Sequence, residues 1–122
     1  MRLSVTDVCN LKCIDSLPDG YAYDTGLDFL ALPEIKTLIN GFALIRTSKI
    51  GISGGEHSLR KDLPDIIKAC SSTIGIEHVA MASNGFKLEA DIQKWVNAGL
   101  DSLNISIYSL DPRMFAAITE HN

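Results

Sequence analysis

Strand-like and helix-like segments alternate along this sequence, and that alternation restricts the fold more than any other feature. Four short segments with alternating apolar residues are predicted to be strands: residues 2–6, 49–53, 77–83 and 102–108. Segments with helical spacing follow them at 32–45, 61–72, 89–99 and from 112 onward. Asp62 and Asp111 stand where N-caps are expected for two of these helices. Four βα units joined by short connections predict a parallel sheet with right-handed crossovers.

The strands carry a second pattern that an ordinary open parallel sheet would not show. Strands buried on both faces are apolar almost throughout, whereas here apolar residues alternate with small or polar ones. One face of the sheet is therefore expected to pack on helices and the other to line a cavity. The predicted fold class is α/β, a partial TIM-like parallel barrel of about four βα units. The residues expected on the cavity face are Arg2, Ser4, Thr6, Gly51, Ser53, Ala80, Ala82, Asn104, Ser106 and Tyr108.

The loops that leave the carboxyl ends of the strands are where such folds bind their ligands. The first loop, "DVCNLKCIDSLPDGY" at 7–21, has two cysteines four residues apart, and the others contain "GGEHSL", "NGF" and "SLDPR". Taken alone, Cys9 and Cys13 are compatible with ordinary thiols on a turn. A zinc site that adds one of three histidines is an alternative, and the candidates are His57, His78 and His121.

Three other residues are interpreted as packing residues. Cys70 lies on the apolar side of its helix and is expected to be a small core residue. Trp95 and Phe86 are expected to pack a helix against the sheet. His78, on the cavity face, is interpreted as a polar residue with satisfied hydrogen bonds.

Charge and composition exclude several classes of partner. The net charge is −4 and lysines and arginines do not cluster, which disfavours nucleic acid and anionic membrane surfaces as partners. No apolar run approaches the length that spans a bilayer. Three cysteines, without an apolar leader segment at the start, favour a cytoplasmic location.

Four motifs in fixed order resemble the amino-terminal part of radical S-adenosylmethionine (SAM) enzymes: the cysteine loop, "SGGE", "SNG" and "NISIYSLD". Further stretches, "RLSVTDVCN", "SLPDGY", "LRKDLPDII" and "SLDP", are similar to the GTP 3′,8-cyclase family of molybdenum cofactor biosynthesis. The resemblance covers the whole chain but only about the first third of a family member. It implies that residues 1–122 are the amino-terminal part of a radical SAM core domain, with the carboxyl-terminal second-cluster domain absent.

The resemblance also implies cofactors, a substrate and roles for individual residues. Family members hold a 4Fe-4S cluster with three cysteines, bind SAM on it and generate a 5′-deoxyadenosyl radical that acts on GTP. Cys9 and Cys13 match two cluster ligands, and Ser16 stands in place of the third. The matching SAM contacts are Gly55 and Ser106, with weaker candidates at Asp15, Gly54, Glu56 and Asn84. Arg2 matches a contact to GTP, with degenerate substrate positions at Gly51 and Ala82.

Several positions depart from the family pattern. A serine hydroxyl stays protonated near neutral pH and is a poor substitute for a thiolate, so Ser16 predicts impaired cluster chemistry. Gly51 lacks the guanidinium that binds phosphate in the family. The remaining departures are Asp15 for an aromatic residue, Ala82 for threonine, His57 for proline, Tyr108 for aspartate, and Arg46 and Glu120 for glycines.

Three hypotheses therefore stay open at the level of sequence. The chain is the amino-terminal portion of a GTP 3′,8-cyclase with impaired chemistry, a non-catalytic nucleotide-binding or protein-interaction module, or a product of gene decay. A half barrel leaves a strand edge unpaired, so marginal stability or self-association through that edge is also expected.

Overall fold

The computed structural model describes residues 1–16, 19 and 29–120. Strands and helices alternate as the sequence predicts, each within a few residues of its expected bounds. The order is β1 (Arg2–Ser4), α1 (Leu32–Leu44), β2 (Lys49–Ser53), a short 3₁₀ turn (His57–Leu59), α2 (Leu63–Ser71), β3 (His78–Ser83), α3 (Leu88–Asn97), β4 (Ser102–Ile105) and α4 (Pro112–Thr119). None of the helices in the described ranges is long and apolar enough to cross a membrane.

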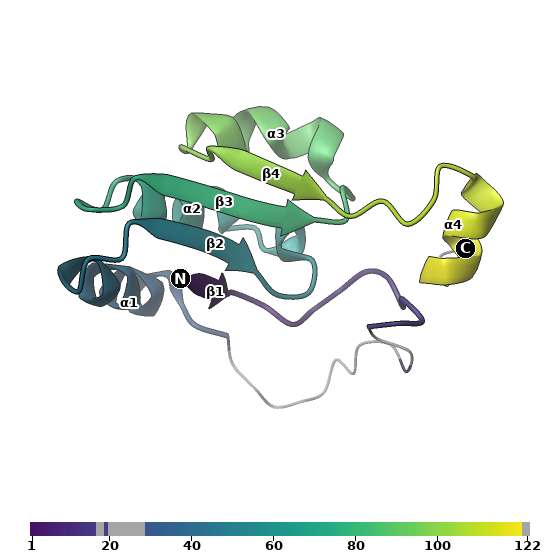
Figure 1. Cartoon of the computed structure of the whole chain (residues 1–122), viewed down its shortest axis with the longest axis horizontal. Coiled ribbons are helices and arrows are strands. Elements are labelled where there is room, and N and C mark those ends of the chain that lie inside the picture. Colours follow the sequence, from purple (N-terminus) through teal and green to yellow (C-terminus); the bar gives the residue numbers. More distant parts are fainter. Residues whose placement is uncertain (17–18, 20–28, 121–122) are drawn as a thin grey trace.

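The four strands form one parallel sheet in the order β1-β2-β3-β4 (Figure 1). Arg2 of β1 pairs with Gly51 of β2, and Gly51 pairs with Ala80 of β3. Ala82 of β3 pairs with Asn104 of β4. The register therefore lays the predicted cavity-facing residues side by side across the sheet, as expected for part of a parallel barrel.

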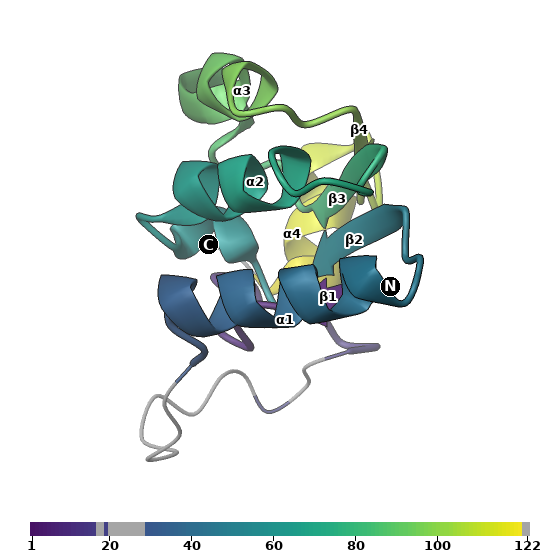
Figure 2. The same cartoon turned by 90° about the vertical axis from the view of Figure 1, so that its left-hand side faces the viewer.

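Helices α1, α2 and α3 cover one face of this sheet (Figure 2). The apolar face of the strands and the inner faces of the helices form the core between them. Its most deeply buried members include Val5, Ile35, Ile39, Ile50, Ile52, Leu63, Ile66, Ile67, Val79 and Trp95. Burial of this set is the main stabilising contribution, at roughly 25 cal/mol per Å² of apolar surface.

The predictions for single packing residues have mixed outcomes. Trp95 is buried as expected, and so is Cys70, whose thiol pKa is raised by burial to about 11. The prediction for Phe86 is wrong, because its side chain is 54% exposed. Phe86 lies in the turn between β3 and α3, before the helix begins, and therefore has no sheet surface to cover.

Helix α4 lies at the carboxyl end of the sheet, past the tips of the strands, and not over the sheet with the other helices (Figure 1). The Asp111 carboxylate caps it, accepting hydrogen bonds from the backbone N–H groups of Arg113 and Met114, as predicted. Its last turn holds the cysteine loop: Lys12 and Ile14 donate backbone hydrogen bonds to the carbonyl oxygens of Thr119 and Ile118 at 3.0 and 3.1 Å.

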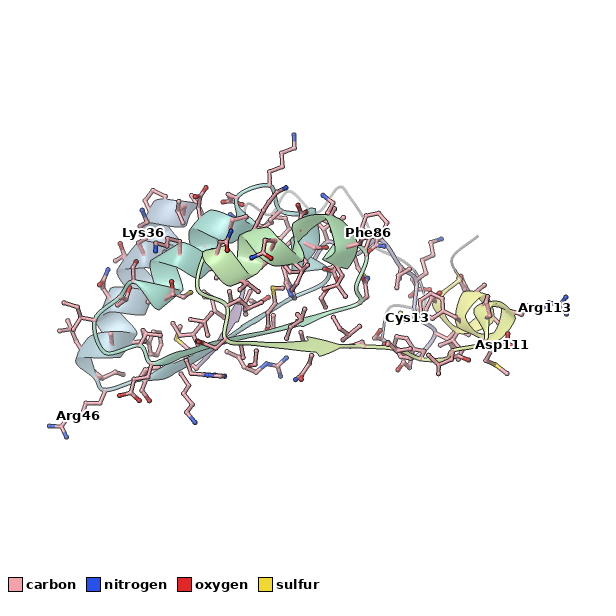
Figure 3. All side chains as sticks on the ribbon, turned by 90° about the horizontal axis from the view of Figure 1, so that it is seen from above. Cys13, Lys36, Arg46, Phe86, Asp111 and Arg113 are labelled. Carbon is pink, nitrogen blue, oxygen red and sulfur yellow. The ribbon has the colours of Figure 1, made fainter. Side chains whose placement is uncertain are left out.

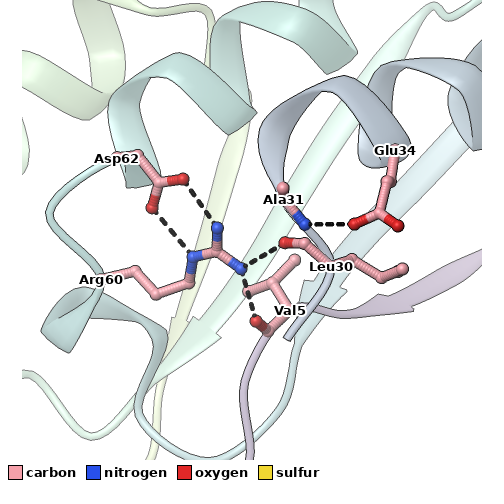
Figure 4. A network of polar contacts seen from close by, with 6 residues as sticks. All are labelled: Val5, Leu30, Ala31, Glu34, Arg60 and Asp62. Carbon is pink, nitrogen blue, oxygen red and sulfur yellow. Dashed lines mark hydrogen bonds and ion pairs between the residues drawn. The ribbon is translucent and has the colours of Figure 1, made fainter. Parts of the chain in front are cut away.

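Asp62 stands at the predicted N-cap position of α2, but the prediction that its side chain caps the helix is wrong. Asp62 occupies the position before the helix, but its side chain makes no capping hydrogen bond. Its carboxylate is bound by the guanidinium of Arg60 at 2.8 and 2.6 Å (Figure 4). The same guanidinium donates to the carbonyl oxygens of Val5 and Leu30, so it ties the end of β1 to the segment that leads into α1.

Two residues that stand where the family pattern has glycine adopt left-handed backbone conformations. Arg46, which follows α1, has a φ of 66°, and Glu120, which follows α4, has a φ of 44°. Side chains with a Cβ are strained in this region, so both helix ends carry a local destabilisation. The expectation that these positions require glycine-like backbone angles is confirmed.

Candidate functional site

A cavity of about 640 Å³ opens at the carboxyl ends of the strands. This volume lies within the range of pockets that hold cofactors and small ligands. Its wall combines the cysteine loop, the loops after β2 and β3, and the segment after β4. The predicted residues that line it are Arg2, Cys9, Cys13, Ser16, Gly54, Gly55, Glu56, Ala82, Asn84 and Ser106, and they are joined by His57 and Tyr108.

Of the other predicted site residues, Gly51 and Asp15 do not line this cavity. Gly51 pairs in register with Arg2, whose long side chain reaches the cavity, whereas Gly51 has no side chain to do so. Asp15 is exposed on the turn that joins Cys13 to Ser16. The rest of the first loop, at 17–18 and 20–28, lies outside the described residues.

The cysteine loop is held by backbone hydrogen bonds. The Ser16 N–H donates to the Cys13 carbonyl oxygen at 3.2 Å, which closes a turn and brings positions 13 and 16 together. Cys13 is buried beside α4 (Figure 3), Cys9 is half-buried and Ser16 is exposed. Within the described ranges, no three His, Cys, Asp or Glu side chains converge as a metal site.

For the zinc alternative, neither His57 nor His78 forms a three-residue metal site with Cys9 and Cys13 among the described residues. The Nε2 atom of His78 lies 3.0 Å from the Ser102 hydroxyl, at the amino end of β3 and away from the cysteines. This agrees with its interpretation as a satisfied polar residue. His121 lies outside the described residues.

The two glycines of the "GGE" loop allow this loop to pack directly on the start of the cysteine loop. Gly54 has a φ of 140°, and a Cβ there would clash with the Thr6 carbonyl oxygen. A Cβ at Gly55 would clash with the Val8 carbonyl oxygen. The N–H groups of Gly55 and Glu56 donate to these same oxygens, from Gly55 to Thr6 at 2.8 Å and from Glu56 to Val8 at 2.7 Å. This close contact fixes the direction in which the chain reaches Cys9.

Glu56 is buried and joins two loops. Its Oε1 atom accepts from the Ser58 N–H at 3.0 Å and the Ser83 hydroxyl at 2.9 Å, and its Oε2 atom accepts from the Asn84 N–H at 2.7 Å. The Asn84 amide then donates to Asn10 Oδ1 at 2.9 Å. Glu56 therefore acts as a clamp between the loops after β2 and β3, and Asn84 extends that clamp to the cysteine loop.

Sequence reasoning missed Asn10 and Ser83, which take part in this network. Their partners are 74 and 27 residues away along the chain, so no local spacing marks them. A weak signal exists for Ser83, because it is polar on the face of β3 that carries Val79 and Met81.

His57 is 1% exposed, and neither of its ring nitrogens has a hydrogen-bond partner in the part of the chain that the structure describes. Burial lowers the pKa of the ring, and the neighbouring Glu56 carboxylate opposes part of this shift. The imidazole is therefore held neutral at the cavity wall.

Of the three positions predicted to contact GTP, only Arg2 carries a side chain that can bind phosphate. Arg2 lies on β1 with its side chain exposed, in register with Gly51. The nearest atoms to a Cβ at Gly51 are 3.9 Å away and include Arg2 Cγ, so the place of a second side chain is open. At Ala82 a methyl group stands in place of a hydrogen-bonding group.

Tyr108 lies close to the cysteine loop. Its side chain lines the same cavity as Cys13 and Ser16, and the pKa of its phenol is raised, chiefly by the Cys13 thiol. Partial burial and the nearby Asp15 carboxylate add to this rise, and Ser16 opposes it. Ser106 is placed by its backbone N–H, which donates to the Ser83 carbonyl oxygen at 2.9 Å.

The donor set at this loop does not fit a 4Fe-4S cluster held by three protein ligands. Such clusters are held by thiolates, and the three positions here supply two thiols and an alcohol.

Comparison with solved structures shows the fold. The crystal structure of BtrN in complex with AdoMet and 2-DOIA matches with a TM-score of 0.75 and 18% sequence identity, covering 96% of this chain and 48% of BtrN. The crystal structure of HydG, a maturase of the FeFe hydrogenase, matches with a TM-score of 0.77 and 13% identity, covering 99% of this chain and 28% of HydG.

Comparison with curated sequences gives closer relatives. A GTP 3′,8-cyclase of Tolumonas auensis is 51% identical over 122 residues, covering the whole chain and 36% of the relative. Those of Vibrio atlanticus and Vibrio cholerae are 52% and 51% identical over 124 residues, each covering the whole chain and 37% of the relative. The chain thus spans little more than a third of the length of these relatives.

A family match covers nearly all of the chain. Residues 3–122 match the Radical SAM superfamily, whose members in general use a 4Fe-4S cluster and SAM. The fold and the order of the loops around the cavity are consistent with this family match. This chain belongs to the radical SAM superfamily.

Proposed function

We propose that this chain is the amino-terminal part of a radical SAM core domain of the GTP 3′,8-cyclase type, and that its cavity binds SAM and GTP without radical chemistry in the chain as it stands. One observation carries the proposal. The loops that match the cyclase motifs converge on a single cavity, in a chain 51–52% identical to GTP 3′,8-cyclases.

The SAM side of the cavity is assigned to Gly55 and Ser106. The Gly55 N–H is already bonded to Thr6, so its carbonyl oxygen is the polar group left to meet a ligand. The Ser106 side chain is exposed at the cavity wall and supplies a hydroxyl that both donates and accepts. The Glu56 clamp holds the loops after β2 and β3 at a fixed separation. The Ser106 N–H joins the second of these loops through the Ser83 carbonyl oxygen. Gly54 and Asn84 act through this arrangement.

The GTP side is assigned to Arg2. Its guanidinium is the cationic group among the lining residues, and a phosphate accepts two parallel hydrogen bonds from such a group. Gly51 and Ala82 lack the groups that would add further donors. Binding of GTP is therefore weaker than in a site with two arginines.

Radical chemistry is left out of the proposal because the donor set does not fit the cluster. Cys9, Cys13 and Ser16 supply two thiols and an alcohol, and an alcohol stays protonated near neutral pH. In this proposal the residues of the chain bind and orient SAM and GTP.

The test is calorimetric titration of the chain with SAM and, separately, with GTP. Arg2→Met should weaken GTP binding by at least about tenfold and leave SAM binding unchanged, because one bidentate phosphate contact is lost. Gly51→Arg should strengthen GTP binding, because the added side chain has room beside Arg2. Arg113→Met is the matched control, since Arg113 lies on α4, outside the cavity lining, and points away from the sheet (Figure 3).

The same titrations decide against the proposal in two ways. Flat heats with both ligands would refute binding. Equal losses for Arg2→Met and Arg113→Met would show that GTP binds through general charge attraction and not at the cavity.

A further inference from the structure

A serine, a histidine and an aspartate meet at the amino ends of β3 and β4, at the end of the sheet away from α4 (Figure 1). The Nε2 atom of His78 lies 3.0 Å from the Ser102 hydroxyl, and the Nδ1 atom of the same ring lies 3.9 Å from Asp101 Oδ2. The ring thus stands between a hydroxyl and a carboxylate, which is the order of a nucleophile, its base and the group that orients the base. The lining of the cavity includes none of the three residues.

Asp101 is held in place by β3. Its backbone N–H donates to the Val79 carbonyl oxygen at 2.9 Å, and its Oδ2 atom accepts from the Val79 N–H at 2.7 Å. The carboxylate is therefore fixed at two points, just before β4 begins. Because it faces Nδ1, it favours the form of the His78 ring that carries the proton on Nδ1. Nε2 is then the acceptor for the Ser102 hydroxyl.

The cluster is open to solvent. The side chains of His78 and Asp101 are 40% and 47% exposed, and Ser102 is exposed. Lys49 of β2 pairs with His78 in the sheet, and strand alternation puts both on the face opposite the buried side chains of Ile50 and Val79. Lys49 is exposed and adds a cation to this face. A cation here can stabilise the negative charge that develops on the carbonyl oxygen of an ester under attack.

We infer that Ser102 is an activated nucleophile that takes acyl groups from small esters, with His78 as its base and Asp101 as a positioning residue. A bond forms between Ser102 Oγ and the acyl carbon, and the bond from that carbon to the leaving oxygen breaks. The hydroxyl proton passes to His78 Nε2 and from there to the leaving oxygen. Water then releases the acid from Ser102, and the same ring takes and returns the proton. This activity does not depend on the proposed binding of SAM and GTP.

The first test is labelling of the chain with a fluorophosphonate, followed by peptide mass spectrometry. The reagent forms an Oγ–P bond with a serine and loses fluoride. Ser102 should be labelled at least about a hundredfold faster than Ser72, an exposed serine after α2 whose hydroxyl donates to the Lys68 carbonyl oxygen. Equal rates at the two serines would overturn the inference, because the bond from Ser102 to His78 would then be structural only.

The second test separates the roles of the histidine and the aspartate. His78→Ala, with native circular dichroism, should slow labelling of Ser102 at least about a hundredfold, and added imidazole should restore part of the rate. A loss without rescue by imidazole would show that His78 acts only on the structure, which would contradict the inference.

Asp101→Asn keeps an oxygen that can accept from the Val79 N–H but removes the charge. This variant should slow labelling of Ser102 by about tenfold. Nitrogen NMR of the His78 ring should show the proton on Nδ1 in the wild type and shared between the two nitrogens in Asp101→Asn. An unchanged ring spectrum and labelling rate would refute the positioning role of Asp101.

The third test is turnover of p-nitrophenyl acetate. The wild type should release p-nitrophenolate at least about tenfold faster than Ser102→Ala, which keeps all the histidines and lysines of the chain as a background. Equal rates would refute esterase activity at Ser102. None of these measurements involves SAM or GTP, so their failure and failure of the ligand titrations can be told apart.

Discussion

The Nη1 atom of Arg60 lies 2.8 Å from the carbonyl oxygen of Val5, just after β1 and before the cysteine loop. The side chain of Arg60 is 15% exposed, and its other nitrogens bind the Asp62 carboxylate (Figure 4). One guanidinium thus connects the entrance of the cysteine loop with the start of α2. It does so outside the cavity lining, so its role can be tested as a stability effect alone.

Arg60→Lys should lower the free energy of unfolding by about 2 kcal/mol, because an ammonium group cannot reproduce the fork that binds Val5, Leu30 and Asp62 together. Urea denaturation monitored by circular dichroism measures this change. Lys94→Ala is the control: Lys94 pairs with Asp91 on the surface of α3, and its loss should change stability by less than about 1 kcal/mol. Equal losses in the two variants would contradict a special role for Arg60.

Arg46→Gly and Glu120→Gly should each raise the free energy of unfolding by about 1 kcal/mol. Both residues have positive φ angles, at which a Cβ is strained and glycine is not. Lys36→Gly, in the interior of α1, is the matched control and should lower stability by about 1 kcal/mol. Thermal unfolding of the three variants distinguishes the expected gains in stability from the expected loss. A loss of stability in Arg46→Gly would show that the left-handed angle is not strained.

His57 should make stability fall at acidic pH. Burial lowers its pKa in the folded state below the ordinary value of 6.5, so the unfolded chain takes up the proton first. The stability contributed by the neutral ring is therefore present above pH 6.5 and is lost as the pH falls through the lowered pKa. His57→Leu removes this dependence.

The measurement is the difference in unfolding free energy between His57→Leu and the wild type across this pH range. Below pH 6.5 the unfolding free energy of the variant should rise relative to that of the wild type, with a slope that approaches about 1.4 kcal/mol per pH unit. His78 is present in both proteins and cancels in the difference. A difference that is constant with pH would mean that the His57 pKa is not lowered by folding.

Self-association should increase with concentration through the outer edge of β4. Within the described residues β4 pairs only with β3, and an open strand edge is a template for a second copy. Asn104→Lys places a charge on this exposed edge and should shift the protein toward monomer in sedimentation experiments. Asn97→Lys adds the same charge on α3 and should not, and a monomeric wild type at all concentrations would contradict the prediction.

The parts of the fold that follow from local pattern are predictable from sequence. The alternation in "KIGIS" fixes β2 at its observed bounds, and the polar face of the strands does form one wall of the cavity. The glycine positions that the family pattern places at Arg46 and Glu120 agree with the positive φ angles observed there. The family resemblance located the loops that meet at the cavity.

The features that sequence reasoning missed depend on contacts between distant residues. Asp62 was expected to cap α2, but Arg60, anchored on Val5, competes for its carboxylate. The place of α4 depends on hydrogen bonds to the cysteine loop about a hundred residues earlier. Tyr108 and Cys13 come from distant parts of the sequence and line the same cavity.

The central claim is that the two thiols and the alcohol of the cysteine loop do not support radical formation in this chain. It is tested most directly by incubating the anaerobically reconstituted protein with SAM and a strong reductant and quantifying 5′-deoxyadenosine by chromatography. The account predicts no release above the blank without protein. Steady release over many turnovers would contradict it.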